Sequence, residues 1–525
     1  MKAFYISAAM AAGLVLSPLR AEMPRTAVKL SSRAAARLLD QATWGPTPAS
    51  ITQLQQMGIS NWLKAQYALN TSSLPAQAIL DTAGNSNNNL GPVQAAFFVN
   101  AVTGQDQLRQ RVAFALSQIW VVSAESGVSP AYAYPSYWGV LRDNAFANYR
   151  DIIKAVTLSP AMGRYLNMAN NNKGNAAKGT AANENYAREM MQLFTLGLTQ
   201  LNPDGSPVLD ASHNPVPTYD QTVVTNMAKA FTGWTYPTAP GVTAKGNNPA
   251  YYIGQMFAVE ANHDTTEKTI FGNTIIPAGQ TAEQDLDSVI EALMKQPTMA
   301  PFVSEQLIQH LVTSNPSAAY IERVSKVFEN DGNGVTGNMQ AVITAILTDS
   351  EARAGDNPNI TLDPNYGHLR EPILFMANIL RGLNATITSQ NTIYTQTANM
   401  SENLFYSPSV FSYFSPQYRT EKGLLGPEFQ IYSTQTVANR ADTVNSALYG
   451  KLDSTTKVNL APFMGYATDN TALLNYIAYV FLHGSMSSDL SQAANEAINT
   501  ATGPTARVEA ALYIVLTSGE YQIVR

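Results

Sequence analysis

The sequence lacks cysteine and has few charged residues. With no cysteine among 525 residues, disulfide bonds, thiolate catalysis, zinc–thiolate sites and iron–sulfur clusters are excluded. Charged residues make up only 13% of the chain, and the formal net charge is −6. No run of Lys and Arg offers the positive surface that a nucleic-acid backbone requires, so a nucleic-acid partner is not expected.

Histidine is also scarce, and local catalytic motifs are missing. The five histidines are His213, His263, His310, His368 and His483. None stands in an H-E-x-x-H or similar metal-binding spacing within one helix. The chain has no G-x-S-x-G motif for a serine nucleophile and no glycine-rich phosphate loop. The sequence therefore predicts no metal site and no cofactor.

The N-terminus has the pattern of a signal peptide. Lys2 precedes the apolar stretch Ala3 to Leu16, which is shorter than the roughly 20 residues that span a membrane. We therefore predict a signal peptide over residues 1–21, and no later stretch is long enough for a span in the mature chain. Asn, Gln, Ser and Thr are abundant, as expected of an exported protein in the periplasm or outside the cell.

The rest of the chain predicts a mainly α-helical protein. Hydrophobic residues make up 45%, enough for a large core. Most apolar positions repeat with helical spacing, which predicts a large, bundle-like, multi-helix globular fold. We expect one large helical domain over residues 22–525. Turn signals at Asn202–Gly205 and Gly272–Asn273 predict small β-hairpin insertions at about 199–219 and 268–276.

The stretch from Asn183 to Gly197, NENYAREMMQLFTLG, predicts one amphipathic helix, which we call the signature helix. Its apolar residues recur at three- and four-residue steps, and Gly197 suits a left-handed helix end. Two interpretations of its polar face stay open. Glu184 and Arg188, four residues apart, are expected to form a structural helix pair. Alternatively, Asn183, Glu184, Arg188 and Glu189 converge on a ligand.

A second candidate site is the loop that carries His263, Asp264 and Lys268. These residue types offer an acid–base group, a carboxylate that orients it, and a cation. In the structural alternative, Asp264 caps a turn and His263 packs beneath it. Glu184 and Glu189 are further catalytic candidates, as a carboxylate pair for glycoside chemistry, although residues five apart on a helix point in different directions.

Several segments resemble one bacterial family. NENYAREMMQLFTLG with AFTGWT, and then LLDQATWGPT, HDTTEKTIFG, LIQHLV, HLREPILF and LTSGEYQIVR, are similar to landmarks of the family called domain of unknown function 1800. The resemblance covers about residues 32–525. It implies a large, secreted, mainly helical protein whose family has no agreed biochemical function. It also implies that the helix bearing Arg109 packs beside the signature helix, and we add Arg109 and Trp234 to the ligand-binding candidates.

Two functions from different classes follow. The favoured hypothesis is an extracellular or envelope protein that binds a polymer or a partner protein through an aromatic, uncharged polar surface. The alternative is an exported hydrolase with a pocket between the signature helix and the His263 loop.

Overall fold

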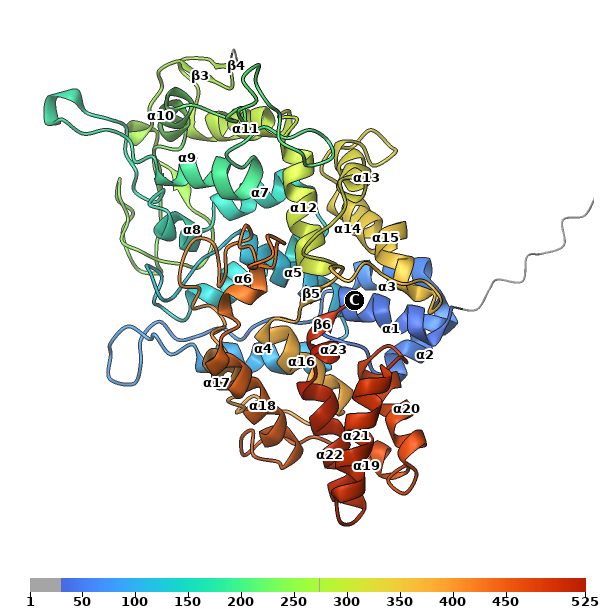
Figure 1. The fold of residues 1–525 in the computed structure, drawn as a ribbon. Coiled ribbons are helices and arrows are strands. Elements are labelled where there is room, and N and C mark those ends of the chain that lie inside the picture. Colours follow the sequence, from blue (N-terminus) through green and yellow to red (C-terminus); the bar gives the residue numbers. More distant parts are fainter. Residues whose placement is uncertain (1–29, 273) are drawn as a thin grey trace, which may run out of the picture.

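The computed structural model describes residues 30–272 and 274–525, so the predicted signal peptide lies outside the described residues. The fold is mainly α-helical, as the sequence predicts, and its strands are short (Figure 1). Within the described ranges, no helix has both the length and the apolar character needed to cross a membrane.

The first region of the chain consists of helices joined by loops. Polar side chains cap the first two helices: Ser31 accepts from the backbone of Ala34, and Thr47 and Ser50 form a reciprocal capping box. The helices are α1 (Ser32–Ala42), α2 (Pro48–Met57), α3 (Ile59–Ala68), α4 (Gly91–Thr103), α5 (Gln107–Ile119), α6 (Ala133–Asp143), α7 (Tyr149–Thr157) and α8 (Pro160–Tyr165).

The signature helix forms where it is predicted but changes its winding. After the short η1 (Ala176–Lys178), an α-helical part, α9 (Asn185–Glu189), continues directly into a π-helix, η2 (Met190–Thr195). Gly197 ends it at φ 72°, in the left-handed region. A β-carbon there would lie 2.8 Å from the ring of Phe302, so this position also needs glycine for close packing.

The middle of the chain holds two small sheets and a run of helices. In the predicted hairpin at 268–276, Lys268 pairs with Ile276 in antiparallel register. At 199–219, Thr199 pairs with Pro217, outside two smaller turns. The elements are α10 (Gln221–Ala230), β1 (Trp234–Thr235), β2 (Phe257–Ala258), η3 (Glu260–Asn262), β3 (Lys268–Ile270), β4 (Thr274–Ile276), α11 (Ala282–Met294), α12 (Met299–Leu311), α13 (Ala318–Glu329), α14 (Met339–Thr348), α15 (Ser350–Arg353) and η4 (Ala354–Asp356).

The last region returns to the centre at its end. Strand β5 pairs antiparallel with β6, joining His368 to Val524 and Leu369 to Ile523. The elements are β5 (His368–Leu369), α16 (Pro372–Gly382), α17 (Tyr394–Asn399), η5 (Pro427–Ile431), α18 (Thr434–Leu448), α19 (Ala461–Met464), α20 (Asn470–Phe481), α21 (Ser488–Thr500), α22 (Pro504–Thr517), α23 (Gly519–Gln522) and β6 (Ile523–Val524).

Helices α5 and α16 form the centre of the molecule. In Figure 1 they lie between α10, α11, β3 and β4 at one end and α19–α22 at the other. Every residue of α16 is buried, and so is nearly every residue of α5. Their polar side chains are therefore enclosed as well and need partners inside the protein. Most of the buried apolar residues form one contiguous core that extends from Ala35 to Tyr521.

Candidate functional site

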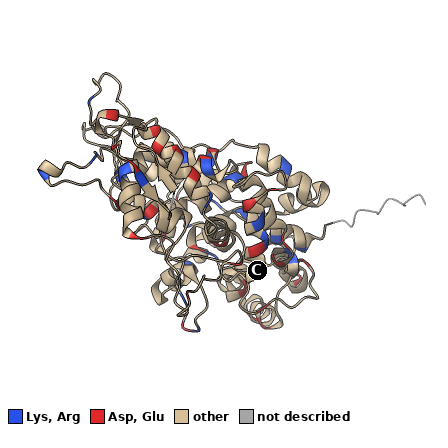
Figure 2. Ribbon diagram, turned by 90° about the horizontal axis from the view of Figure 1, so that it is seen from above, with Lys and Arg blue, Asp and Glu red and all other residues tan. Residues whose placement is uncertain are grey.

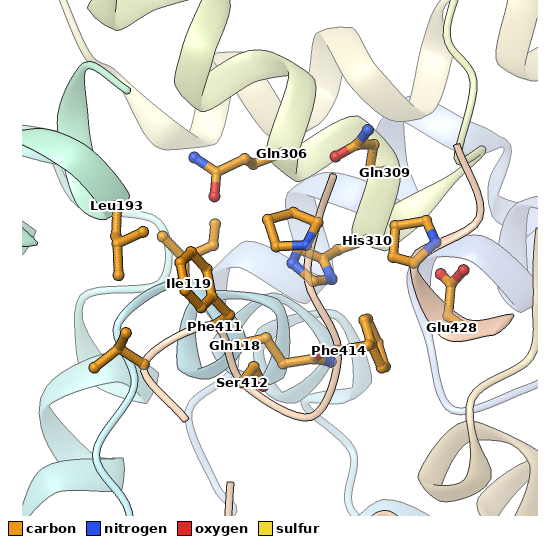
Figure 3. A pocket seen from close by; sticks show the side chains of 13 residues that line it. Gln118, Ile119, Leu193, Gln306, Gln309, His310, Phe411, Ser412, Phe414 and Glu428 are labelled. Carbon is orange, nitrogen blue, oxygen red and sulfur yellow. The ribbon is translucent and has the colours of Figure 1, made fainter. Parts of the chain in front are cut away.

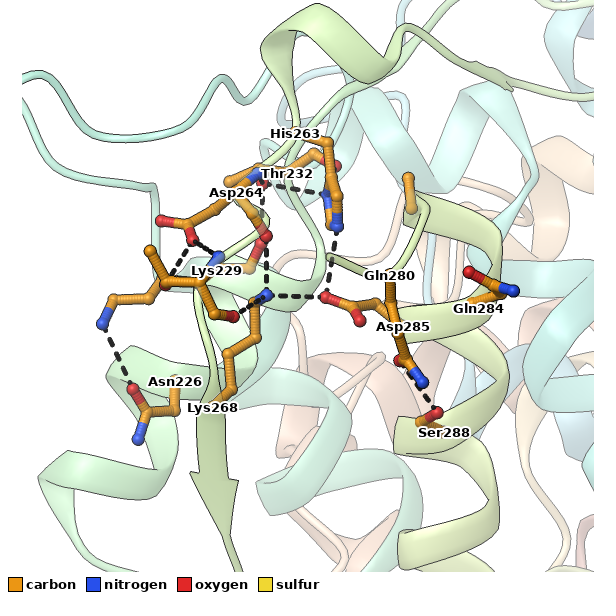
Figure 4. A network of polar contacts seen from close by, with 12 residues as sticks. Asn226, Lys229, Thr232, His263, Asp264, Lys268, Gln280, Gln284, Asp285 and Ser288 are labelled. Atoms are coloured by element: carbon orange, nitrogen blue, oxygen red, sulfur yellow. Dashed lines mark hydrogen bonds and ion pairs between the residues drawn. The ribbon is translucent and has the colours of Figure 1, made fainter. Parts of the chain in front are cut away.

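The side chain of His263 is completely buried and does not contact the carboxylate of Asp264. Its Nε2 lies 3.1 Å from Oδ2 of Asp285 on α11, and its Nδ1 lies 2.9 Å from the carbonyl oxygen of Thr232 (Figure 4). His263, Lys268 and Asp285 have no exposed side-chain surface. A β-carbon at Gly233 would lie 2.9 Å from that of His263, so the loop packs tightly here.

Lys268 completes this buried network. Its ammonium group donates to Asp285 Oδ2 at 2.8 Å and to the carbonyl oxygens of Asp264 and Thr266 at 2.6 and 2.7 Å. Those three bonds use all its donors. The Asp264 carboxylate instead caps a turn by accepting from the Thr266 amide at 2.9 Å. The three predicted residues thus come close together, in an arrangement that ties the loop to α11. The sequence reasoning missed Asp285, which lies 22 residues beyond His263.

On the signature helix, Arg188 donates to Glu184 at 3.1 Å, as in the helix pair of the structural interpretation. Their side chains are 40% and 32% exposed. Glu184 also accepts from Thr225 at 2.9 Å and from Gln221 at 2.8 Å, both on α10. These bonds hold the signature helix against α10 near the surface.

The remaining candidates of this region are held by backbone groups or packing. The side-chain oxygen of Asn183 accepts a hydrogen bond from the backbone N–H of Asn185 at 2.9 Å, which fixes the turn before α9. Glu189 is half-buried; burial raises the pKa of its carboxyl, and Arg188 offsets part of that rise. Trp234 is buried at 4% exposure in β1. Arg109 donates to the carbonyl oxygens of Leu69 and Tyr67 at 2.6 and 2.9 Å, so its guanidinium serves the turn after α3.

A cavity lies between the centre of the molecule and the segment 410–428. It is bounded by the end of α5, by α12 and by η2. Next to this boundary, Trp120 stacks on Phe194 of η2 with ring centroids 4.3 Å apart. The space open to water-sized molecules is about 30 Å³. We call it the central cavity. The residues that line it are Gln118, Ile119, Leu193, Gln306, Gln309, His310, Val410, Phe411, Ser412, Phe414, Pro416, Pro427 and Glu428 (Figure 3).

Three uncharged polar side chains of this lining have buried atoms without a hydrogen-bond partner among the described residues. They are Oε1 of Gln118, Nε2 of Gln306 and Oγ of Ser412. Gln306 and Ser412 lie on opposite sides of the cavity (Figure 3). Ser412 is only 3% exposed and has a φ of 67°, a left-handed conformation that costs a non-glycine residue about 1–3 kcal/mol. Buried polar atoms and backbone strain are frequent where a protein holds a ligand.

Two buried glutamates lie directly behind the cavity. Gln118 donates to Oε2 of Glu371 at 2.9 Å, and Glu402 lies against Glu371. Burial raises the pKa of Glu402 well above its usual range, and the neighbouring Glu371 adds to the rise. Burial also raises the pKa of Glu371, and the charge of Arg111 opposes this rise. Glu402 also has a structural role, because its Oε2 accepts the Ile373 amide at 2.7 Å in the first turn of α16.

A second side of the cavity is formed by His310, with Arg111 beneath it. The buried Arg111 donates to the carbonyl oxygen of His310. Burial, and then the charges of Arg111 and His368, lower the pKa of His310 to about 3, so its imidazole is neutral near pH 7. Glu428 meets His368 with 3.3 Å between Oε1 and Nδ1. A neutral imidazole and a carboxylate that already contacts a neighbouring side chain therefore face the cavity.

The sequence reasoning did not select this site, although the signal was present. His310 lies in LIQHLV, and His368 and Glu371 lie in HLREPILF, two of the segments on which the resemblance rests. They are separated by about sixty residues, and Gln118 by far more, so no local spacing joins them. Within the described part of the chain, no group of three or more His, Asp or Glu side chains is arranged to hold a metal ion.

Comparison with known families agrees with the resemblance. A family model described as protein of unknown function (DUF1800) matches residues 37–523, so the chain belongs to this family. No curated protein and no solved structure matches the chain.

Proposed function

We propose that the protein is exported and binds an uncharged, hydroxyl- or amide-bearing ligand, a unit of an extracellular polymer, at the central cavity. The observation that carries this proposal is the set of three partnerless polar atoms on Gln118, Gln306 and Ser412. A hydroxyl or amide group can both donate and accept, and so can satisfy such a mixed set of atoms. Export is inferred from Lys2 and the apolar stretch after it.

The charges support an uncharged ligand. Charged residues are sparse along the ribbon, and both signs are interspersed (Figure 2). At the cavity itself, His310 is neutral near pH 7 and Glu428 is engaged by His368. An anion would have to give up its hydration without gaining an opposite charge, which is costly, and the Glu428 carboxylate already contacts His368 and Ser314.

The size of the cavity limits how the ligand binds. About 30 Å³ is room for one water-sized group and excludes a whole sugar ring. Phe411 lines the cavity and is also 40% exposed, so the cavity meets the surface at this ring. A polymer unit therefore inserts a single hydroxyl or amide group between Gln306 and Ser412, while its apolar face stacks on Phe411.

The structure gives less support to a hydrolase site at the His263 loop. His263 and Lys268 are completely enclosed together with Asp285, and each N–H donor of Lys268 is in use. An enzyme hypothesis is better placed at Glu371 and Glu402, a buried carboxyl pair with raised pKa values behind the same cavity. The enzyme hypothesis would be favoured if the protein hydrolysed a bound oligosaccharide and Glu402→Gln abolished this hydrolysis but not the binding.

Calorimetric titration with a panel of neutral oligosaccharides, including N-acetylated ones, tests the binding proposal. We expect at least one to bind, and Ser412→Ala and Gln306→Ala to weaken its affinity about tenfold, because each removes one hydrogen bond in a buried site. Gln492→Ala, an exposed glutamine on α21, is the matched control. Equal affinity in all four proteins would overturn the assignment of the cavity. N-terminal sequencing of cell fractions tests export, and an intact Met1 in the cytosol would overturn that part.

A further inference from the structure

A second cavity, lined by other residues than the central cavity, is bordered by positively charged side chains. It holds about 450 Å³, within the range of small-ligand sites. It lies between the start of α1, the turn after α20 and the start of α23, and it shares no lining residue with the central cavity. Its polar lining consists of Arg33, Arg370, His483, Ser485, Ser487, Glu520 and Arg525.

The partly exposed Arg33 differs from the arginines buried around this cavity in its lack of an ion-pair partner among the described residues. Asp40 is bound by Arg370 through both oxygens, at 2.7 and 3.0 Å, and Asp356 is shared by Arg37 and Arg353. Arg33 is left with no carboxylate within 4.0 Å among the described residues. Its guanidinium donates instead to a carbonyl oxygen, that of Gly355, at 2.7 Å and to the hydroxyl of Ser485.

The backbone of His483, in the wall of this cavity, is strained. Its φ of 54° lies in the left-handed region, which a side chain with a β-carbon rarely adopts. The conformation places Nε2 2.9 Å from Oδ2 of Asp40, where the imidazole donates to the carboxylate. Among the described residues of the lining, the one carboxylate side chain is that of Glu520, which already accepts from the amide of Ser487 at 3.2 Å and from its hydroxyl.

We propose that this cavity binds an oxyanion, a phosphate or carboxylate group, through Arg33. A guanidinium offers two parallel N–H groups that match the oxygens of such anions, and the pairing is strongest where water is partly excluded. Burial and the neighbouring Arg37 lower the pKa of Arg33 and Asp356 offsets part of this, so an anion that adds negative charge is stabilised there. The hydroxyl of Ser485, which accepts from Arg33, keeps its own hydrogen as the additional donor at the site. This inference does not depend on the proposed function of the central cavity.

Calorimetric titration of the full-length mature protein with inorganic phosphate, and separately with acetate, tests the proposal at constant ionic strength set with chloride. We expect saturable binding of at least one anion, and Arg33→Gln to weaken it at least tenfold. Binding of phosphate alone identifies a phosphate site, and binding of acetate alone a carboxylate site. Arg323→Gln is the matched control, because this arginine is 46% exposed and pairs with Asp349 elsewhere on the surface.

Two outcomes would overturn the proposal. One is the lack of saturable binding of either anion; the other is unchanged affinity in Arg33→Gln. Circular dichroism first checks that Arg33→Gln is folded. If it is not, Arg33→Lys takes its place: it keeps the charge but loses the guanidinium fork, and affinity equal to that of the parent protein would then contradict binding by the fork.

Discussion

The imidazole of His263 is paired with Asp285, 3.1 Å away on α11, and not with the aspartate that follows it in the chain. The other ring nitrogen faces the carbonyl oxygen of Thr232, so both nitrogens meet an oxygen acceptor. The pair therefore connects the loop before β3 to α11 and to the end of α10. This buried pair forms a joint between the three elements, and its contribution to the free energy of unfolding can be measured.

Replacing Asp285 with alanine is expected to destabilise the protein by about 3–5 kcal/mol, because the buried Lys268 and His263 lose their shared carboxylate. Urea unfolding followed by circular dichroism measures this loss. The matched control is Asp287→Ala on the same helix, whose side chain is 38% exposed where it pairs with Lys154; it should cost within about 1 kcal/mol. A similar cost for both variants would contradict the structural role of the joint.

The Arg188–Glu184 pair of the signature helix should contribute little to stability. Both side chains are about a third exposed or more, so water and salt screen their attraction. We expect Arg188→Ala and Glu184→Gln each to change the free energy of unfolding by about 1 kcal/mol or less. Thermal melts of the two variants beside the parent protein measure this. A large loss in Arg188→Ala alone would show that Arg188 also compensates the buried carboxylate of Glu189.

His310 should make the folded protein sensitive to acid. Its pKa is lowered from 6.5 to about 3, so between these values the unfolded chain binds a proton that the folded protein excludes. Stability therefore falls as the pH decreases through this window, by at most about 1.4 kcal/mol per pH unit from this residue. Urea unfolding between pH 7.5 and 4 should show a flatter curve for His310→Gln than for the parent protein.

The comparison with His310→Gln is needed because buried glutamates act in the opposite direction. They are present in both proteins, so only the difference between the two curves reports on His310. Parallel curves would show that the imidazole is not held neutral by its surroundings.

Glu402 should have the opposite effect, at higher pH. Its pKa is raised in the folded state, so its contribution to stability is complete below the ordinary value of 4.5 and is lost as the pH rises through the raised value. Glu402→Gln keeps an oxygen that can accept the Ile373 amide but cannot ionise. We expect it to equal or exceed the parent protein in stability at pH 8 and above. Denaturant unfolding at pH 5, 7 and 9 measures this; a variant whose stability falls from pH 5 to pH 9 as steeply as that of the parent protein would contradict it.

The helical fold was predictable because it depends on local patterns. Apolar spacing and capping residues place the helices, and Gly197 ends the signature helix as expected. The π-helical winding after Glu189 was not predictable, because the same apolar stripe fits an α-helix equally well. Its packing, with Phe194 stacked on Trp120, comes from another part of the chain.

The candidate sites were predictable only where their residues are close in sequence. His263 and Lys268 were found together, but Asp285 was not, since nothing in the loop indicates which helix will cover it. The central cavity joins Gln118, His310 and Ser412, which meet only through the packing of α5, α12 and the segment 410–428. The strain at Ser412 is likewise invisible in a sequence, where serine gives no sign of a left-handed backbone.

The pairing of β5 with β6 also bears on how the chain reaches its native state. Arg370 N–H donates to the carbonyl of Gln522 at 2.7 Å, and the Arg370 side chain binds Asp40 of α1. These contacts join segments separated by about 150 residues and by 330 residues. Closing such long loops is slow, and a nascent chain cannot form this junction until residues 522–524 have been synthesised. Earlier helices must then remain soluble in a partly assembled state, which makes the last step of folding the one most exposed to aggregation.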